Sequence, residues 1–352
     1  MKAIPFFTAV TAMAVLASPS MATPLSGTDA LREWNLVVLG DLKSSSEVEG
    51  RTFVGGDLSG TSSNYQIGTP ASSGTGKPGL TVVGNVTGDI KNINNGAGAV
   101  IGGNVESGFN LNGPAQTVKV GGTISNTNAN QNSVTSGLSA SDPGFSSGLN
   151  TQAMVLTGGM KELSTTLGDL SANSQMSISG GRATFAASPN ADGLAVFSIS
   201  AADLDSINEI AFNLNGADTA IVNVSGTAIN LNDNFLGGTA GLGEHVIWNF
   251  GEAQSLDLTT SWGGSVLAPW ASAHTSNYIQ GSAVFGSLVQ DGEMHLGTYA
   301  GGYNPPVVTP PGGSSGGTPI PEGAAWLIFV LASGALLYWR RRGHIAKSRP
   351  SA

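Results

Sequence analysis

The sequence repeats Val54-Gly-Gly-Asp-Leu58 in three later stretches: Val83-Gly-Asn-Val86, Ile101-Gly-Gly-Asn-Val105 and Val120-Gly-Gly-Thr-Ile124. Each copy holds an aliphatic residue, one or two glycines, one Asp, Asn or Thr, and a second aliphatic residue. The polar position moves from 57 to 85, 104 and 123, in steps of 28, 19 and 19 residues. The longer first step contains a Gly/Ser/Pro-rich insertion at residues 68–79. The chain therefore carries an internal repeat of about 19–20 residues.

A repeat of this length is typical of one coil in a parallel β-solenoid. In such a fold, the inward aliphatic residues of one coil stack on those of the next. Glycine lets the backbone turn a corner with positive φ, Asn and Asp tolerate the same geometry, and stacked Asn side chains can hydrogen-bond between coils. An antiparallel sandwich is the alternative, but its hairpins would give spacings of about 8–12 residues. The observed spacing favours the solenoid.

The repeat stops in residues 126–148, which are rich in Ser, Gly and Asn and predict a loop. In residues 150–170 the apolar side chains fall mostly at helical spacing, so we expect an amphipathic helix along one flank of the solenoid. Apolar strand-like segments return over residues 176–299. The predicted fold class is therefore mainly β: a parallel β-solenoid (β-helix), interrupted, with one flanking α-helix.

Both ends of the chain carry targeting patterns. Residues 1–22 contain Lys2, an apolar stretch and Ser20-Met21-Ala22, and predict a secretory signal peptide that is cut after Ala22. Residues 324–339 are an apolar run with aromatic residues at both ends, followed by an arginine cluster. This pattern predicts a single C-terminal transmembrane helix with the arginines on the cytoplasmic side.

These patterns divide the chain into four parts. Residues 1–22 are the signal peptide, and residues 23–303 are the solenoid domain. Residues 304–320 are a Pro/Gly/Ser linker, part stiff and part flexible. Residues 321–352 are a sorting tail that contains the predicted transmembrane helix. We therefore expect an exported domain that is first anchored in the membrane at its C-terminus.

Acidic residues outnumber basic ones, with 23 Asp+Glu against 14 Lys+Arg. Six of the basic residues lie in the terminal targeting segments, so residues 23–323 carry 8 − 23 = −15 charges. Lys and Arg are absent between Arg182 and Arg340. Such a surface repels phosphate backbones, so we expect no nucleic-acid partner. Cysteine is also absent, which excludes disulfides, thiol catalysis and cysteine metal sites.

Several motifs in residues 31–300 resemble the choice-of-anchor A family of adhesin-like domains. The opening motifs are Asn35-Leu-Val-Val-Leu-Gly-Asp-Leu42 and Glu47-Val-Glu-Gly-Arg-Thr-Phe-Val-Gly-Gly-Asp57. The closing motifs are Ile247-Trp-Asn-Phe-Gly-Glu-Ala253, Trp262-Gly-Gly-Ser-Val-Leu-Ala-Pro269, Gln280-Gly-Ser282 and Gly292-Glu-Met-His-Leu296. The resemblance implies an adhesive surface domain that occurs with different C-terminal anchors. It supplies neither a ligand nor a catalytic residue.

The C-terminal tail resembles a PEP-CTERM sorting signal, which an exosortase processes. The short motif is Pro321-Glu322-Gly323, and the arginine cluster is Arg340, Arg341 and Arg342. The motif lacks its second proline, which leaves open the sorting-enzyme subclass and whether the tail is cleaved. The resemblance implies a Gram-negative envelope, an exosortase-type partner, and transfer of the domain to the cell surface or extracellular matrix.

Residue types that carry catalysis or bind metals are sparse. The solenoid domain has His245, His274 and His295 without zinc-site spacing, and a structural pair explains Glu293 and His295 better than a metal site. The pairs Glu47/Glu49 and Asp203/Asp205 could serve glycoside hydrolysis, but their turn-like contexts indicate solvated acids. We therefore expect no enzymatic activity and no cofactor. Ca²⁺ remains an option, with three candidate donors: Asp41, Asp57 and Asp89.

Three tryptophans, Trp248, Trp262 and Trp270, lie within 23 residues. Core packing is one role for them, and stacking of an exposed member on a sugar is the other. The function we expect is that of an anchored adhesin or matrix protein, which binds a polysaccharide or matrix ligand through a rigid solenoid. The alternatives are an ice-binding solenoid, although Thr-x-Thr rows are missing, and a polysaccharide-degrading enzyme.

Overall fold

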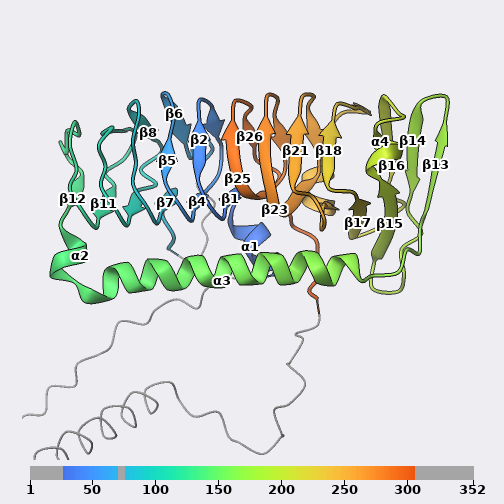
Figure 1. The fold of residues 1–352 in the computed structure, drawn as a ribbon, viewed down its shortest axis with the longest axis horizontal. Helices are drawn as coiled ribbons and strands as arrows, with labels where there is room; N and C mark the ends of the chain where they lie inside the picture. Colours follow the sequence, from blue (N-terminus) through green and yellow to red (C-terminus); the bar gives the residue numbers. More distant parts are fainter. Residues whose placement is uncertain (1–26, 70–75, 306–352) are drawn as a thin grey trace, which may run out of the picture. The chain divides into compact units, whose positions relative to one another are not determined.

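The computed structural model describes residues 27–69 and 76–305. These residues form mainly parallel sheets with few helices, stacked as a β-solenoid with one long helix along its side (Figure 1). The prediction of a mainly β, parallel fold is confirmed. The predicted signal peptide, most of the linker and the predicted transmembrane helix at residues 324–339 lie outside the described residues. Within the described ranges, no helix is long and apolar enough to cross a membrane.

The coils present three faces, each built from one strand or bridge per coil. The first, which we call the helix face, has the strand order β12 (Ser133–Thr135), β11 (Thr117–Val120), β9 (Ala99–Ile101), β7 (Leu80–Val82), β4 (Thr52–Val54), β1 (Leu36–Val38), β25 (Ala283–Gln290), β23 (Ser265–Thr275), β20 (Val246–Asn249), β17 (Thr219–Ser225) and β15 (Leu194–Ser200). Every neighbouring pair on this path is parallel. Alternate side chains therefore point into the solenoid core and towards the helix.

The other two faces follow in each coil. The second face contains β5 (Leu58–Ser59), β2 (Leu42–Ser44), the C-terminal halves of β25 and β23, β21 (Ser255–Leu258) and β18 (Ala228–Leu231). The third face contains β10 (Phe109–Leu111), β8 (Lys91–Ile93), β6 (Ser63–Tyr65), β3 (Glu47–Val48), β26 (Met294–His295), β24 (Ile279–Gln280) and β22 (Trp262–Gly263). A four-stranded sheet continues the solenoid with β19 (Asn234–Leu236), β16 (Glu209–Asn213), β14 (Arg182–Ala186) and β13 (Gln175–Ser179).

The first described strand, β1, lies in the middle of the solenoid, not at one end. Strand β1 lies between β4 and β25, although β25 is almost 250 residues later in the sequence. Residues 36–135, the N-terminal arm, build coils from β1 outward to β12. Residues 175–305, the C-terminal arm, start at β13 and build coils back to β25. The blue and orange strands therefore meet at the centre of Figure 1. We call this junction the seam.

Helix α3 (Pro143–Gly168) connects the far ends of the two arms. Its 26 residues span about 39 Å, or roughly eight strand spacings. The helix buries a stripe of apolar side chains against the helix face: Leu149, Leu156, Met160, Leu163 and Leu167. The predicted flanking helix is confirmed, but it begins seven residues earlier, because Asp142 caps the amide of Gly144 and Pro143 occupies the first turn.

The loop predicted for residues 126–148 is only partly correct. It contains β12, the short helix α2 (Leu138–Ser141) and the first turns of α3. Three more short helices are α1 (Thr28–Glu33), α4 (Ala201–Leu204) and α5 (Leu242–His245). Within residues 126–148, β12, α2 and the first turns of α3 lack the apolar periodicity by which a helix or strand is recognised in a sequence, and tertiary contacts fix them instead.

The polar residue of the repeat forms a ladder between coils, as predicted. Its members, from the seam outward, are Asp41, Asp57, Asn85, Asn104 and Thr123. Each side-chain oxygen accepts a hydrogen bond from the backbone amide of the next member, at 2.6–2.9 Å. Glycine precedes each later member because a Cβ there would overlap the same side-chain oxygen. The repeat therefore encodes both the side-chain acceptor and the space that it needs.

We expect Asn104→Ala to lower the free energy of unfolding by about 1–2 kcal/mol, because it removes the acceptor for the Thr123 amide and hydroxyl (2.9 and 3.2 Å). Denaturant unfolding followed by circular dichroism measures this loss. Glu106→Ala is the control, since Glu106 is an exposed residue of the same arm whose side chain has no hydrogen bond to another coil within the described residues, and about 0.5 kcal/mol or less is expected there. Equal losses in the two variants would contradict a stabilising role for the ladder.

The buried side chain of Asn35 links the two arms at the seam. Its Nδ2 donates to the carbonyl oxygens of Gly281 (2.8 Å) and His295 (3.0 Å), which belong to the last coils of the chain. Its Oδ1 accepts from the amide of Gly50 (2.9 Å) in the first coil. Asn35 and Gly281 lie in two of the motifs that carry the family resemblance. Those motifs therefore build the junction between the arms.

Candidate functional site

The structure places the three candidate tryptophans differently. Trp248 and Trp262 are fully buried and contact each other, with ring centroids 4.9 Å apart, and Nε1 of Trp248 donates to the carbonyl of Gly263. They belong to an aromatic cluster with Phe185, Phe197, Phe212, Phe235 and Phe250. Trp248 and Trp262 are therefore core residues and not exposed ligand contacts, because both side chains point inward from their strands. Trp270 is half-buried and keeps an accessible face.

The candidate acid pairs are engaged with neighbouring coils. On the third face, Glu47 accepts from Asn64 and Glu49 accepts from the amide of Leu296. Oε2 of Glu293 lies 2.7 Å from Nε2 of His295, whose ring stacks on Tyr278 at 4.5 Å. Glu293 and His295 form the structural pair that the sequence favoured over a metal site.

The candidate calcium donors do not converge on one point. Asp41 and Asp57 each use Oδ1 to accept a backbone amide in the ladder. Asp89 lies beside the buried Lys91, whose ammonium donates to two backbone carbonyls. Over the ranges 27–69 and 76–305, no group of three or more His, Asp or Glu side chains could hold a metal ion.

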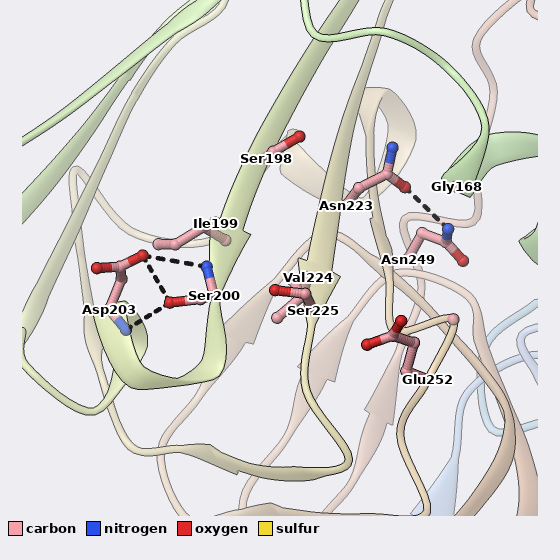
Figure 2. Close-up of a pocket in the computed structure, with 11 residues that line it drawn as sticks. Gly168, Ser198, Ile199, Ser200, Asp203, Asn223, Val224, Ser225, Asn249 and Glu252 are labelled. Atoms are coloured by element: carbon pink, nitrogen blue, oxygen red, sulfur yellow. Dashed lines mark hydrogen bonds between the residues drawn. The ribbon is translucent and has the colours of Figure 1, made fainter.

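A hollow lies where α3 ends, on the C-terminal arm (Figure 2). We call it the helix-end hollow; its volume is about 420 Å³. Its floor is formed by the C-terminal ends of β15, β17 and β20, which lie side by side in register. Its lining residues are Gly168, Ser198, Ile199, Ser200, Asp203, Asn223, Val224, Ser225, Asn249, Gly251 and Glu252.

Two asparagines fix the inner wall of the helix-end hollow. Nδ2 of Asn223 donates to the carbonyl of Leu167 (2.7 Å) in the last turn of α3. Nδ2 of Asn249 donates to Asn223 (2.8 Å), and Oδ1 of Asn249 accepts from the hydroxyl of Ser164 (2.6 Å). Both amides are therefore occupied. They hold the helix end against the sheet rather than facing a ligand.

The outer wall carries groups with free hydrogen-bonding capacity. Asp203 uses Oδ2 in a capping box with Ser200, and Glu252 uses Oε2 to accept the amide of Gly226. Within the described residues, the second oxygen of each carboxylate has no hydrogen-bond partner, and neither do the hydroxyls of Ser198 and Ser225. Figure 2 shows Asp203 and Glu252 on either side of β17, with Ser225 between them. The hollow can therefore accept several hydrogen bonds and can attract positive charge.

A second hollow, about 360 Å³, lies on the second face of the same arm. It is lined by Asn230, Asp257, His274 and Val289, together with serines of β21 and β23. The ring of His274 bridges two carboxylates, with Nδ1 2.9 Å from Asp257 and Nε2 3.3 Å from Asp291. The hydrogen bond from Ser45 and the neighbouring His274 hold the pKa of Asp291 below its usual range.

Asp233 is the one carboxyl group whose pKa is strongly displaced upward within the described residues. It is fully buried between β18 and β19, and neither of its carboxylate oxygens has a hydrogen-bond partner there. Burial raises the pKa of Asp233 to about 7, and the charge of Asp205 acts in the same direction. The folded protein therefore holds this carboxyl group in its neutral form under mildly acidic conditions.

We expect Asp233→Asn to stabilise the protein above pH 7 and to remove part of the dependence of stability on pH. In the unfolded chain an Asp has a pKa near 3.9, so between about pH 4 and pH 7 only the folded state keeps the proton. The free energy of unfolding then falls by about 1.4 kcal/mol for each pH unit over that window. Denaturation of both proteins at a series of pH values measures the difference. A constant difference between pH 4 and pH 8 would contradict the assignment.

A family model described as "Putative Ice-binding-like adhesive domain" matches residues 27–296. The chain belongs to this family. The match covers both arms, α3 and the seam. The coil order, with β1 between β4 and β25, therefore lies within the ice-binding-like adhesive domain. No curated protein and no solved structure matches the chain. The expectation of an adhesin-like domain is therefore supported at the level of this family.

The helix-end hollow was not predicted from the sequence. Its serines and carboxylates come from three coils, so no short motif contains them. Two signals were present: the capping-box spacing of Ser200 and Asp203, and the absence of Lys and Arg after Arg182. Glu252 also lies inside one of the motifs of the family resemblance. None of these signals alone indicates a cavity.

Proposed function

We propose that the protein is an exported, surface-anchored adhesin or matrix protein, which binds a polysaccharide or matrix ligand through its solenoid. Membership of the ice-binding-like adhesive family supports the adhesive role. The solenoid supports it physically, because stacked coils give a long rigid surface with polar side chains in regular rows. The finer assignment, to choice-of-anchor A adhesins, rests on the motifs in residues 31–300.

The observation that carries the proposal is that the two ends of the solenoid domain meet. The hydroxyl of Thr28 donates to Asn304 (2.7 Å), and Arg32 donates to the carbonyls of Gly301 and Tyr303. Residues 28–32 and 301–304 of the described chain therefore lie side by side near the seam. A tether attached there holds the solenoid by its middle, so both arms and their second and third faces stay available to a ligand.

The anchoring part of the proposal rests on the sequence of the tail. A signal peptide at 1–22 would export the chain, and the apolar run at 324–339 would retain it in the inner membrane. An exosortase-type enzyme would then act at Pro321-Glu322-Gly323, by analogy with PEP-CTERM signals. The domain would reach the cell surface or the matrix of a Gram-negative bacterium, without nucleic-acid partners.

Deletion of the gene, followed by attachment and biofilm assays, tests this function. We expect attachment to fall and to return with the full-length protein. A variant that ends before residue 321 is the matched control, because it keeps the solenoid and loses the tail. We expect that variant to be secreted and not to restore attachment. Unchanged attachment of the deletion strain to every surface tested would overturn the proposal.

Ice binding is a second candidate, because the family description names an ice-binding-like domain. On the second face, Ser255, Ser272 and Ser287 lie beside one another on adjacent strands and form one row across the coils. The neighbouring row, two residues further along these strands, contains Asp257 and His274. A row with charged side chains differs from the regular Thr-x-Thr rows expected of a flat ice-binding face. A thermal-hysteresis measurement on the purified protein decides between the candidates.

The proposed role is non-enzymatic. The acids Glu47, Glu49 and Asp203 each accept hydrogen bonds from neighbouring backbone or side-chain groups, which is sufficient to explain their positions. A glycan-depolymerisation assay tests this part of the proposal. Turnover that a single Asp or Glu substitution abolishes would identify a polysaccharide-degrading enzyme instead.

A further inference from the structure

We infer that the helix-end hollow is a subsite for an amine-bearing sugar unit, so that the polysaccharide ligand is cationic. This inference rests on the proposed adhesive function and narrows its ligand class. Three properties of the C-terminal arm carry it: the unequal charge of the two arms, the free groups that line the hollow, and the position of the α3 C-terminus.

The two arms differ sharply in charge. The N-terminal arm (36–135) has 5 Lys+Arg and 6 Asp+Glu, a net charge of 5 − 6 = −1. The C-terminal arm (175–305) has 1 Lys+Arg and 11 Asp+Glu, a net charge of 1 − 11 = −10. Its single cation, Arg182, forms an ion pair with Glu209 at 2.8 Å. The arm that contains the hollow therefore attracts cations and repels anionic glycans.

Two acidic side chains and the end of α3 line the hollow at separate places. The free oxygens of Asp203 and Glu252 flank β17, and Gly168 contributes the C-terminal end of α3 to the wall. The C-terminus of a helix carries a partial negative charge, which favours a nearby cation. No Lys or Arg lines the hollow. An ammonium group in the hollow would therefore meet the carboxylate of Asp203 or of Glu252, in a wall without opposing positive charge.

The remaining lining groups suit the hydroxyls of a sugar. The hydroxyls of Ser198 and Ser225 are exposed, and each can donate one hydrogen bond and accept others. The hollow is large enough for one sugar unit and opens to solvent, since Ser198, Ser225 and Glu252 are exposed. A sugar bound there can therefore belong to a longer chain. An ammonium with neighbouring hydroxyls is the chemistry of a deacetylated amino sugar.

The test titrates the purified full-length chain with glucosamine oligosaccharides and with N-acetylated oligosaccharides of the same length, by calorimetry. We expect the free-amine series to bind about tenfold more tightly at low ionic strength, and added salt to remove most of the difference. Raising the pH until the amines lose their protons should have the same effect as salt. Equal binding of the two series would overturn the inference.

Glu252→Gln is the diagnostic variant, because its amide oxygen can still accept the Gly226 amide while the charge is lost. We expect its affinity for the free-amine series to fall about three- to fivefold. Glu244→Gln is the charge-matched control, on the exposed helix α5 of the same arm, and should bind as the wild type does. Equal losses of affinity in the two variants would mean that the oligosaccharide is attracted by the overall negative charge of the arm and not by a defined subsite. That result would overturn the inference.

The two proposals can fail separately. If the deletion strain loses attachment but the protein binds both oligosaccharide series equally, the adhesive function holds and the cationic subsite is wrong. If the protein selects free amines but the deletion strain attaches normally, the subsite holds and the adhesive function is wrong.

Discussion

Gly102→Ala is expected to lower the free energy of unfolding by about 3–5 kcal/mol, or to prevent folding. A Cβ at this position would overlap the carbonyl oxygen of Val83 in the preceding coil. That coil cannot move away, because the amide of Gly102 donates to the carbonyl of Val82 at 2.8 Å. Equilibrium unfolding in denaturant, followed by circular dichroism, measures the loss.

Gly158→Ala is the matched control, with an effect of opposite sign. A Cβ at Gly158 would meet no atom within 4 Å, since this glycine lies on the exposed side of α3. Alanine in a helix interior is favoured over glycine by about 0.5–1 kcal/mol, so we expect this variant to be more stable than the wild type. Destabilisation by both substitutions would indicate a general intolerance of alanine, and would contradict the coil-contact explanation for Gly102.

These two glycines also separate what the sequence could reveal about the fold from what it could not. Gly102 belongs to the repeat that predicted the solenoid, because each coil needs a glycine where two backbones approach. The ladder from Asp57 to Thr123 was predictable for the same reason: the spacing of about 19–20 residues brings one polar position above another. Gly158 has a low helix propensity, but packing of the apolar stripe of α3 outweighs it.

The order of the coils could not be predicted in the same way. The repeat shows that coils exist, but parallel coils of similar composition can stack in any order that the connections permit. The pairing of β1 with β25 joins residues 36–38 to 283–285, and no local pattern marks either strand as a neighbour of the other. Only α3 hints at the arrangement, because a helix of about 39 Å can carry the chain from one end of the stack to the other.

The candidate site was predictable only in its chemistry. The sequence identified an acidic, lysine-free second half, which became the C-terminal arm. It could not identify the hollow, since Ser198, Ser225 and Glu252 come together only when β15, β17 and β20 pair in register. The tryptophans were identified in the sequence, but their role was not, because an aromatic side chain can serve either as a sugar-stacking surface or as a core residue. Trp248 and Trp262 lie on the inward side of their strands, so both are core residues.

Asn35→Ala is expected to destabilise both arms together, by about 3–5 kcal/mol. The substitution removes two donors from the buried carbonyls of Gly281 and His295 and one acceptor from the amide of Gly50. Each buried backbone group left without a partner costs about 1–3 kcal/mol. Hydrogen exchange measures the effect residue by residue, and we expect protection to fall first in β1 and β25, on both sides of the seam.

Two further variants distinguish the seam from ordinary surface amides. Asn94→Ala removes an amide that links coils within the N-terminal arm alone, through Tyr65 and Asn112, and should cost about 1 kcal/mol or less. Asn35→Asp keeps an acceptor for Gly50 but places a charge, without donors, against two buried carbonyls, so it should be at least as harmful as alanine. If Asn35→Ala unfolded the N-terminal arm while the C-terminal arm kept its protection, the arms would fold independently. The seam would then be a contact between two finished units, not the junction on which both depend.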